Sequence, residues 1–179
     1  DRNPISTSIF YFALGKPKTV WGLWRQVAGH PERAAMLKFL QNNFEDPRWR
    51  IAAAKNAYAL LGNNDSVSER DEVHGIPGSM PSSSTEYAAA FFLLGDCPKD
   101  AINVCIKHMR DYDLAVFIAR IRHDRAVLLP WLIETHLLPK AREHEDKWLT
   151  HWCWWAQGKK EQAVEGIYVS VKTHWIYIG

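Results

Sequence analysis

The sequence has no long apolar run and little of several other features that would assign it to a class. No stretch approaches the roughly 18–20 apolar residues of a membrane-spanning helix, and no charged segment followed by a hydrophobic signal core opens the chain. It contains three cysteines, Cys97, Cys105 and Cys153, an odd count without regular spacing. These absences argue against a membrane span, a secretory signal and a disulfide framework, and they fit a reducing compartment.

The sequence also lacks a large excess of positive over negative charge, or the reverse. The chain has 22 Lys and Arg against 20 Asp and Glu, which gives a formal net charge of +2. Nucleic-acid-binding domains usually present a strongly basic face, so we do not expect nucleic acid as a partner. Tryptophan is abundant instead, at nine in 179 residues. Because tryptophan packs in cores and is enriched in protein interfaces, this excess favours a protein-binding role.

The sequence also lacks the motifs of enzymes. It has no His-Glu-x-x-His pair, no glycine-flanked nucleophile and no glycine loop placed after a strand to cradle a phosphate. We therefore predict no catalytic residue, no cofactor and no bound metal, with Cys153 as a small core side chain. An active site assembled only between folded helices, such as a Cys–His pair, stays open as the weakest alternative.

Hydrophobic periodicity predicts helices in every long segment outside residues 63–84. Val20, Leu23, Trp24 and Val27, for example, follow the i, i+3, i+4, i+7 spacing of one helical face. The predicted helices cover residues 5–14, 19–30, 33–44, 48–62, 86–94, 98–109, 111–121 and 126–138, with two more in 145–169. Pro130 is expected to kink or interrupt the segment 126–138.

One kind of turn recurs between the predicted helices. An apolar helix end, a glycine, a few polar residues or a proline and a second apolar helix occur around Gly15, Gly95 and Gly158. At Gly95 we expect a helix-ending residue with positive φ, and Asp96 is expected to cap the next helix. Short turns favour antiparallel neighbours, so the predicted fold is all-α, an α-solenoid-like stack of antiparallel helix pairs without a strict repeat.

Residues 63–84 interrupt the helical pattern. They are rich in Ser, Gly, Pro and charged residues, which predicts a disordered loop or insertion and the one internal boundary. The expected organisation is helical hairpins in 1–62, the loop, further hairpins of the same domain in 85–169, and a tail at 170–179. The chain opens in mid-pattern at Asp1, and we interpret it as a piece of a longer protein.

Arg48 and Trp49 are predicted partner-binding residues. They follow Asp46 and Pro47, which are suited to cap and begin a helix, so both side chains lie in its first turn. Such basic and aromatic neighbours also suggest a helical-repeat RNA-binding module as the alternative function. Two acidic residues, Glu45 and Asp46, offset this positive charge and favour a protein partner.

Trp154 is the third predicted partner-binding residue. In "KWLTHWCWWAQ" (147–157), helical spacing places Trp148, Trp152 and Trp155 on one stripe, which we expect to pack in the core. Trp154 points to another side of the same helix. It is therefore the better candidate for contact with a neighbouring helix or protein.

Two long stretches together resemble one family. They are "YFALGKPKTVWGLWRQVAGHPERAAMLKFLQNNFEDPRWRIAAAKNAYALLG" (11–62) and "EYAAAFFLLGDCPKDAINVCIKHMRDYDLAVFIARI" (86–121). They resemble the C-terminal helical region of the large RAVE-complex subunit, whose animal relatives are the Dmx-like proteins or rabconnectins. The chain departs from the family's pattern at 63–84, which looks inserted, and at "RHDRA" (122–126), where the family has an acidic turn.

The resemblance implies a non-enzymatic assembly factor. It implies a role in regulating assembly of the vacuolar-type proton-translocating ATPase (V-ATPase), and hence vacuolar acidification. The implied partners are RAVE subunits, a Skp adaptor and subunits of the peripheral V-ATPase sector. The implied location is the cytoplasm, with peripheral association on vacuolar or endosomal membranes through those partners.

Overall fold

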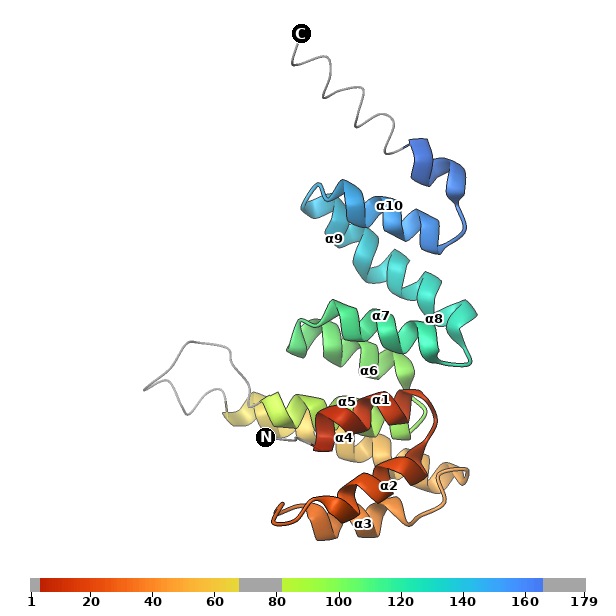
Figure 1. The fold of residues 1–179 in the computed structure, drawn as a ribbon. Helices are drawn as coiled ribbons and strands as arrows, with labels where there is room; N and C mark the ends of the chain where they lie inside the picture. Colours follow the sequence, from red (N-terminus) through yellow and green to blue (C-terminus); the bar gives the residue numbers. More distant parts are fainter. Residues whose placement is uncertain (1–3, 68–81, 166–179) are drawn as a thin grey trace. The chain divides into compact units, whose positions relative to one another are not determined.

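Every regular element in the part of the chain that the structure describes is a helix. The computed structural model describes residues 4–67 and 82–165, and no strand occurs among them. The all-α prediction is therefore confirmed for these residues. The chain divides into two compact units, residues 1–122 and 123–179, so the boundary between units falls inside the predicted 85–169 segment. Figure 1 shows the helices of both units.

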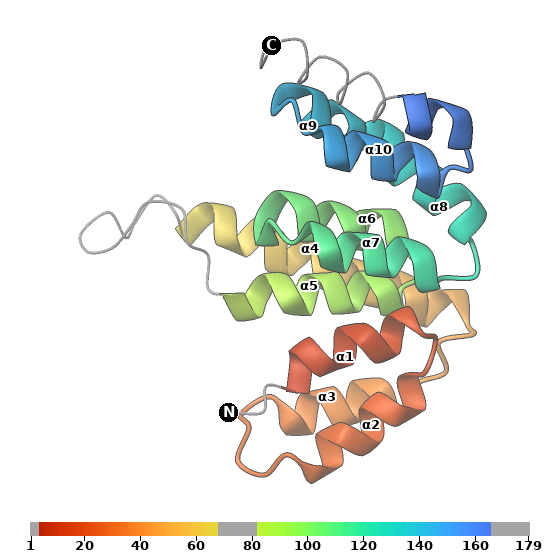
Figure 2. The ribbon, with the colours of Figure 1, turned by 45° about the horizontal axis from the view of Figure 1, so that its top comes forward.

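Unit 1 (residues 1–122) is built from neighbouring helix pairs. Within its described residues, α2 lies beside α3, α4 beside α5, and α6 with its π-helical extension η1 beside α7, while α1 lies against α5 (Figure 2). Four of these helices begin with proline, whose fixed φ suits a first helical position. The bounds are α1 (Pro4–Ala13), α2 (Pro17–Gln26), α3 (Arg33–Leu40), α4 (Pro47–Val67), α5 (Ser82–Leu94), α6 (Pro98–Val104), η1 (Cys105–Met109) and α7 (Tyr112–Ile121).

Helix α5 is the centre of unit 1. It contacts α1, α4, α6 and η1, and every residue from Tyr87 to Gly95 is buried. A helix surrounded by other helices has no polar face, which explains the unbroken apolar run of this segment. Ala88, Ala89 and Ala90 are at most 1% exposed. Their small side chains let the neighbouring helices approach closely, as the sequence predicts.

Aromatic side chains join the helix pairs of unit 1. Trp24 on α2 is fully buried, and its Nε1 donates a hydrogen bond to Ser8 Oγ at 3.3 Å. Its ring lies 6.4 Å from that of Tyr87 on α5, Tyr87 lies 6.2 Å from Phe91, and Phe91 meets Phe39 of α3 edge to face at 5.6 Å. Each such pair contributes about 0.5–1.5 kcal/mol beyond the area that it buries. The series therefore holds α2 and α3 against α5.

Both helices that flank the predicted loop extend into it. Helix α4 continues past Gly62 to Val67, and α5 begins at Ser82, so the prediction of a loop from 63 to 84 is wrong at both ends. Gly62 does not adopt positive φ and is an interior helical residue. A glycine ends a helix only when the backbone turns left-handed there. The rest of the predicted loop, 68–81, and the predicted tail, 170–179, lie outside the described residues.

The prediction of positive φ at Gly95 is wrong, although glycines at the other two predicted turns are left-handed. Gly15 (φ 68°) and Gly158 (φ 79°) have positive φ, but Gly95 does not, and the left-handed residue of the α5–α6 turn is Asp96 (φ 59°). The turns match when they are aligned on their prolines, because Pro17 follows Gly15 by two residues and Pro98 follows Asp96 by two. Asp96 therefore ends α5 and does not cap α6, whose N-cap residue is Cys97.

Gly95 is instead needed for a close approach between backbones. A Cβ added to it would lie 2.9 Å from the carbonyl oxygen of Arg50, 3.2 Å from the backbone nitrogen of Ala54 and 3.3 Å from the carbonyl oxygen of Phe91. The first distance is shorter than a Cβ tolerates and the other two are tighter than ordinary contact, and two of the three atoms belong to α4. The end of α5 can therefore touch the α4 backbone only because residue 95 has no side chain.

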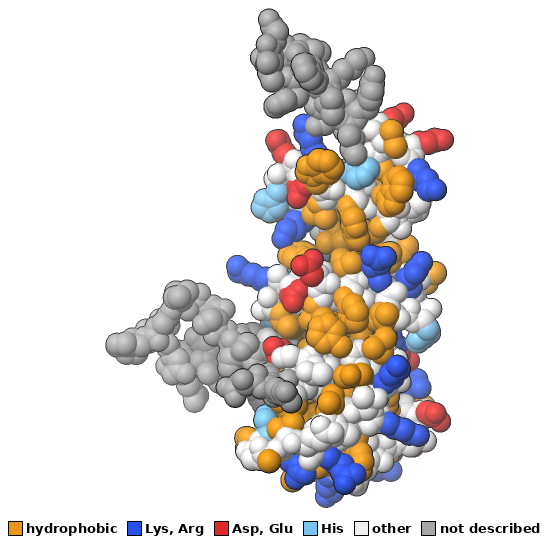
Figure 3. All heavy atoms as spheres, in the orientation of Figure 1, with side chains coloured by type: hydrophobic (Ala, Val, Ile, Leu, Met, Phe, Trp, Pro, Cys, Tyr) orange, Lys and Arg blue, Asp and Glu red, His pale blue; other side chains and the backbone are white. Residues whose placement is uncertain are grey.

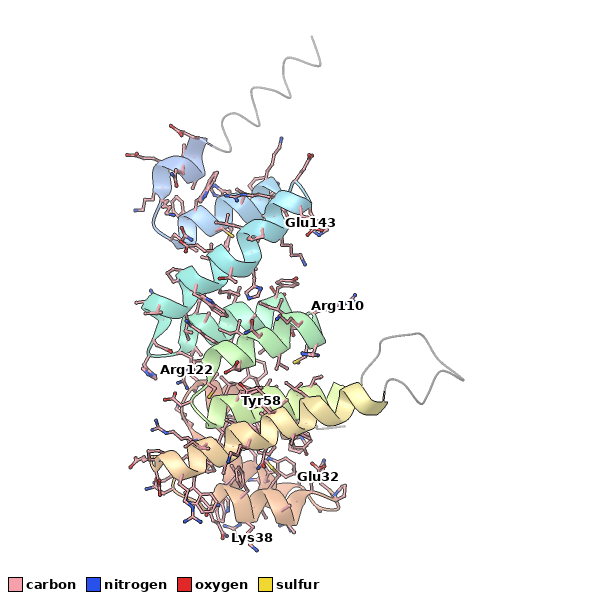
Figure 4. The ribbon with its side chains drawn as sticks, turned by 180° about the vertical axis from the view of Figure 1, so that it is seen from behind. Glu32, Lys38, Tyr58, Arg110, Arg122 and Glu143 are labelled. Atoms are coloured by element: carbon pink, nitrogen blue, oxygen red, sulfur yellow. The ribbon has the colours of Figure 1, made fainter. Side chains whose placement is uncertain are left out.

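The carboxylate of Asp96 joins three segments of unit 1. Arg50 Nη1 on α4 lies 3.2 Å from Asp96 Oδ2, and Arg122, the C-cap residue of α7, pairs with Asp96 Oδ1. The side chain of Arg122 is only 7% exposed, and its place in unit 1 is labelled in Figure 4. Arg50 also donates from Nε to the carbonyl of Phe44 at 2.7 Å. Because charge-assisted hydrogen bonds are the stronger kind, this cluster fixes the end of α7 to the α4–α5 pair.

A π-helical turn changes the direction of the chain before α7. The predicted helix 98–109 is α6 followed by η1, and Arg110 then takes the left-handed conformation (φ 55°) while the Asp111 N–H donates to the Cys105 carbonyl at 2.9 Å. The Asp111 carboxylate accepts from the Leu114 N–H at 2.8 Å and so caps α7. This turn places Met109 and Asp111 beside the start of α7.

Unit 2 (residues 123–179) also contains a π-helical segment. Its elements are α8 (Arg125–Leu132), η2 (Ile133–Leu137), α9 (Leu138–Glu143) and α10 (Lys147–Ala156), followed by helical residues 160–165. The predicted interruption at Pro130 is wrong, because the backbone stays helical through Ile133 and Leu138. The alternative, a kink at Pro130, stays a prediction. The described core of the unit includes Leu128, Leu132, Ile133, Leu137, Ala141, Cys153 and Ala163.

We expect Gly95→Ala to lower the free energy of unfolding by about 1–3 kcal/mol, because the new Cβ must push α4 and α5 apart. The matched control is Gly22→Ala, in the interior of α2, where a Cβ would meet nothing within 4 Å. That change is expected to stabilise the chain by about 0.5–1 kcal/mol through helix propensity. Urea unfolding of both variants measures the difference, and equal effects would contradict the close approach.

We expect Asp96→Asn to destabilise the chain by about 1–2 kcal/mol, because it removes the charged partner of Arg50 and of the buried Arg122. Asparagine also tolerates the left-handed conformation, so the change tests the ion pairs and not the backbone. Glu45→Gln, at an exposed position before α4, serves as control and should stay within about 0.5 kcal/mol of the parent. If both variants unfold at the same urea concentration, the Asp96 cluster does not hold the segments together.

Candidate interaction surfaces

Arg48 and Trp49 lie in the first turn of α4, as predicted. The Asp46 carboxylate accepts a hydrogen bond from the Arg48 N–H at 2.9 Å, so it caps the helix that Pro47 begins. Arg48 is exposed, and its guanidinium lies 5.4 Å from the centroid of the Trp49 ring. Stacking on an aromatic face holds such a guanidinium in place while its donors stay in water. Arg48 is thus oriented and open to a partner.

Trp49 is divided between the core and the surface. Its ring is half-buried and meets Phe39 of α3 edge to face at a centroid distance of 6.4 Å. Phe39 also meets Phe44 at 5.4 Å. Trp49 therefore fixes α3 against the start of α4, and its truncation would change packing as well as any contact with a partner. Arg48 is the cleaner residue on which to test binding.

The tryptophans of α10 lie differently from the prediction. Trp148 and Trp155 are 75% and 54% exposed, so the expectation that their stripe packs in the core is wrong. The buried residue of α10 is Cys153, which at 100° per residue lies roughly 140–160° around the helix from both tryptophans. The burial of Cys153 confirms its prediction as a core side chain. Trp154 is half-buried, and its role as a partner contact stays a prediction.

His151 joins these exposed tryptophans into an aromatic row. Its ring lies 6.5 Å from that of Trp148 and 6.2 Å from that of Trp155. Its Nδ1 forms a hydrogen bond at 2.7 Å with the carbonyl of Ala163, and the Lys160 ammonium lies 5.9 Å from the Trp155 ring centroid. Residues 160–165 therefore pack beside the row without covering Trp148.

A groove lies between α1, α5 and the start of α7. Its volume is about 480 Å³. Apart from one serine, the side chains that line it are apolar or acidic: Ser6, Ile9, Phe10, Glu86, Met109, Asp111, Asp113, Leu114 and Phe117. On this face Figure 3 shows acidic side chains next to hydrophobic ones over α7. The sequence did not predict the groove, because its residues come from segments spread between Ser6 and Phe117, which no local pattern connects.

The surroundings of the three cysteine thiols disfavour their ionised form. Burial, followed by the nearby charge of Asp111, raises the pKa of Cys105 to about 12, and burial with Asp146 raises that of Cys153 to about 11. Burial also raises the pKa of Cys97, with Asp100 and Asp96 as further causes. A thiol must ionise to act as a nucleophile or metal ligand, so all three are poorly suited to either role near neutral pH. Among the described residues, no group of three or more His, Cys, Asp or Glu side chains is arranged to hold a metal ion.

Comparison with known families and proteins identifies relatives for nearly the whole chain. The family model described as "RAVE protein 1 C terminal" matches residues 1–65 and 83–176. It leaves 66–82 unmatched, inside the 63–84 segment that departs from the family's pattern. The relatives include "Regulator of V-ATPase in vacuolar membrane protein 1" of Saccharomyces cerevisiae, which is 34% identical over 167 residues. The aligned region is 93% of this chain but 11% of the yeast protein.

Two further relatives extend the comparison. The protein of the same name from Schizosaccharomyces pombe is 32% identical over 174 residues, which are 97% of this chain and 12% of that protein. "DmX-like protein 1" of Mus musculus is 39% identical over 121 residues, or 68% of this chain and 3% of the mouse protein. The chain thus spans only a small part of the relatives it matches. The predicted resemblance is confirmed, and the chain belongs to the RAVE protein 1 C-terminal family.

Proposed function

We propose that this chain is a non-enzymatic scaffold segment of the RAVE complex that takes part in regulating assembly of the V-ATPase. The observation that carries the proposal is the family match over residues 1–65 and 83–176. It is supported by two fungal relatives whose names describe regulators of V-ATPase in the vacuolar membrane. Because the chain spans 11–12% of those relatives, we assign it one binding function within a larger assembly.

The proposed partners are proteins. They are subunits of the peripheral V-ATPase sector, other RAVE subunits and, from the family resemblance alone, a Skp adaptor. We place the chain in the cytoplasm, reaching vacuolar or endosomal membranes through these partners. Among the described residues, no helix has the length and apolar content to cross a bilayer. The names of the relatives do not favour the RNA-binding alternative.

Exposed hydrophobic side chains support a protein-binding role. Both units present large apolar or aromatic residues to solvent, a composition typical of interface cores. In unit 1 these are Phe10, Leu14, Ile51, Tyr58 and Ile121, and in unit 2 they are Val127, Trp148, Trp155 and Val164. Tyr58, labelled in Figure 4, projects from α4 with its ring 4.8 Å from that of Phe92.

We expect Arg48→Ala to weaken binding of the purified peripheral V-ATPase sector by about 2 kcal/mol, or roughly 30-fold in Kd. The reason is that an oriented, exposed guanidinium stacked on tryptophan is a typical binding anchor. The unfolding free energy should change by less than about 0.5 kcal/mol, because Arg48 is exposed. Biolayer interferometry with the immobilised chain measures the affinity, and urea unfolding measures the stability.

The matched control is Arg25→Ala. Arg25 is exposed on α2, and its guanidinium lies 4.9 Å from the Trp21 ring centroid, so the same charge and stacking are removed from another surface. Binding equal to the parent in both variants would place the anchor elsewhere. No binding by the parent would contradict the proposed function. A parallel titration with single-stranded RNA over a range of salt concentrations tests the alternative, because a phosphate-dominated binder loses affinity steeply as salt rises.

A further inference from the structure

We propose that the groove between α1, α5 and α7 binds a segment of a protein partner in which an apolar side chain is flanked by Lys or Arg. The inference rests on the proposed function, because it assigns a surface to a protein partner of this chain. The groove is defined by the residues given above and lies wholly within unit 1. Its shape, its apolar floor and its acidic rim each point to this kind of segment.

The floor of the groove is apolar and open to solvent. Ile9 and Leu114 are buried at its base, and Phe10 meets Phe117 edge to face at a centroid distance of 5.2 Å. Phe10 remains 45% exposed. A volume of about 480 Å³ lies in the usual range of about 300–1,000 Å³ for ligand sites. Such a floor favours an apolar anchor, because burying it removes apolar surface of both partners from water.

The apolar surface continues from the groove along both helices that border it. Leu14, the residue after α1, follows Phe10 by four and donates its N–H to the Phe10 carbonyl at 3.1 Å, so the two lie on one side of α1. Ile121 follows Phe117 by four on α7, along one face of that helix. Leu14 and Ile121 are both more than 40% exposed. Helices α1 and α7 lie against one another. Together the two rows make a strip that suits an extended or helical segment better than a small molecule.

The rim of the groove is acidic. Glu86 Oε2 accepts a hydrogen bond from Ser6 Oγ at 2.7 Å, and Asp111 Oδ1 accepts the N–H of Leu114, so both carboxylates are held in place. Asp113, the second residue of α7, is exposed. Arg110 is not among the lining residues, and its side chain points away from the helices in Figure 4. The groove therefore carries negative charge on a chain whose formal net charge is +2, and charge complementarity selects a basic segment.

The test measures fluorescence anisotropy of labelled peptides of about 12 residues mixed with the whole chain. One peptide alternates Arg with Leu and Phe, a second has Glu in place of every Arg, and a third has Ser in place of every Leu and Phe. We expect only the first to bind appreciably. Asp113→Lys should weaken that binding by about tenfold or more, because it reverses an exposed charge on the rim. Glu143→Lys, the same change at an exposed position in unit 2, should leave Kd within about twofold.

A second variant tests the floor. Phe117→Ala removes half of the aromatic pair and should weaken binding by about tenfold. If it fails to fold, Asp113→Lys decides alone. Equal binding of the Glu peptide, or parent-like binding by Asp113→Lys, would overturn the inference. So would a dimer of the chain in sedimentation that Asp113→Lys dissociates, because the occupant would then be a second copy.

The peptide assay contains no V-ATPase, so its outcome does not depend on whether the proposed function is correct. Peptide binding with the expected variant effects, but no binding of the peripheral sector, would contradict the proposed function and still support the groove as a binding site. Binding of the peripheral sector without binding of any peptide would contradict only the proposal that the groove binds a basic, apolar segment.

Discussion

At Gly95 the end of α5 rests against the backbone of α4, with the place of a Cβ 2.9 Å from the Arg50 carbonyl oxygen. The next residue, Asp96, takes a left-handed conformation and pairs with both Arg50 and Arg122. One residue thus sets how closely two helices approach, and its neighbour ties a third helix to them. The close approach is possible only for glycine, and the paired charges are held where they reinforce it. The arrangement of α4, α5 and α7 depends on this two-residue turn.

The turn at Gly95 and Asp96 also affects the surface at the opposite ends of α5 and α7. Helix α7 is fixed at its C-cap by the Arg122–Asp96 pair, while its N-terminus carries Asp111 and Asp113 to the groove. Helix α5 runs from the groove, where Glu86 lies, to the turn at Gly95. The burial of α5 from Tyr87 onward leaves the outer helices to present the accessible apolar side chains, among them Phe10 of α1. Internal packing therefore decides which side chains remain for a partner.

Local pattern predicted the elements and missed most of what depends on tertiary contact. Of the predicted helical face, Val20 and Trp24 are buried, whereas Leu23 is half-buried and Val27 follows the end of α2. Asp46 caps α4 as expected, because capping acts over a few residues. Gly95 was expected to be left-handed because turns were matched on glycine, whereas the following proline marks the shared geometry. The exposure of Trp148 depends on which side of α10 packs against α9 and η2, which periodicity does not tell. The groove residues come from segments distant in sequence. The binding roles of Arg48, Trp49 and Trp154 stay predictions.

The central claim is that folded unit 1 presents a surface for a protein of the V-ATPase assembly. Hydrogen–deuterium exchange of the whole chain, alone and with the purified peripheral V-ATPase sector, tests it most directly. The account predicts slower exchange in the partner's presence for amides of α1 and of residues 109–121, which border the groove. Exchange that is unchanged throughout the chain, or slowed only within residues 125–165, would contradict it.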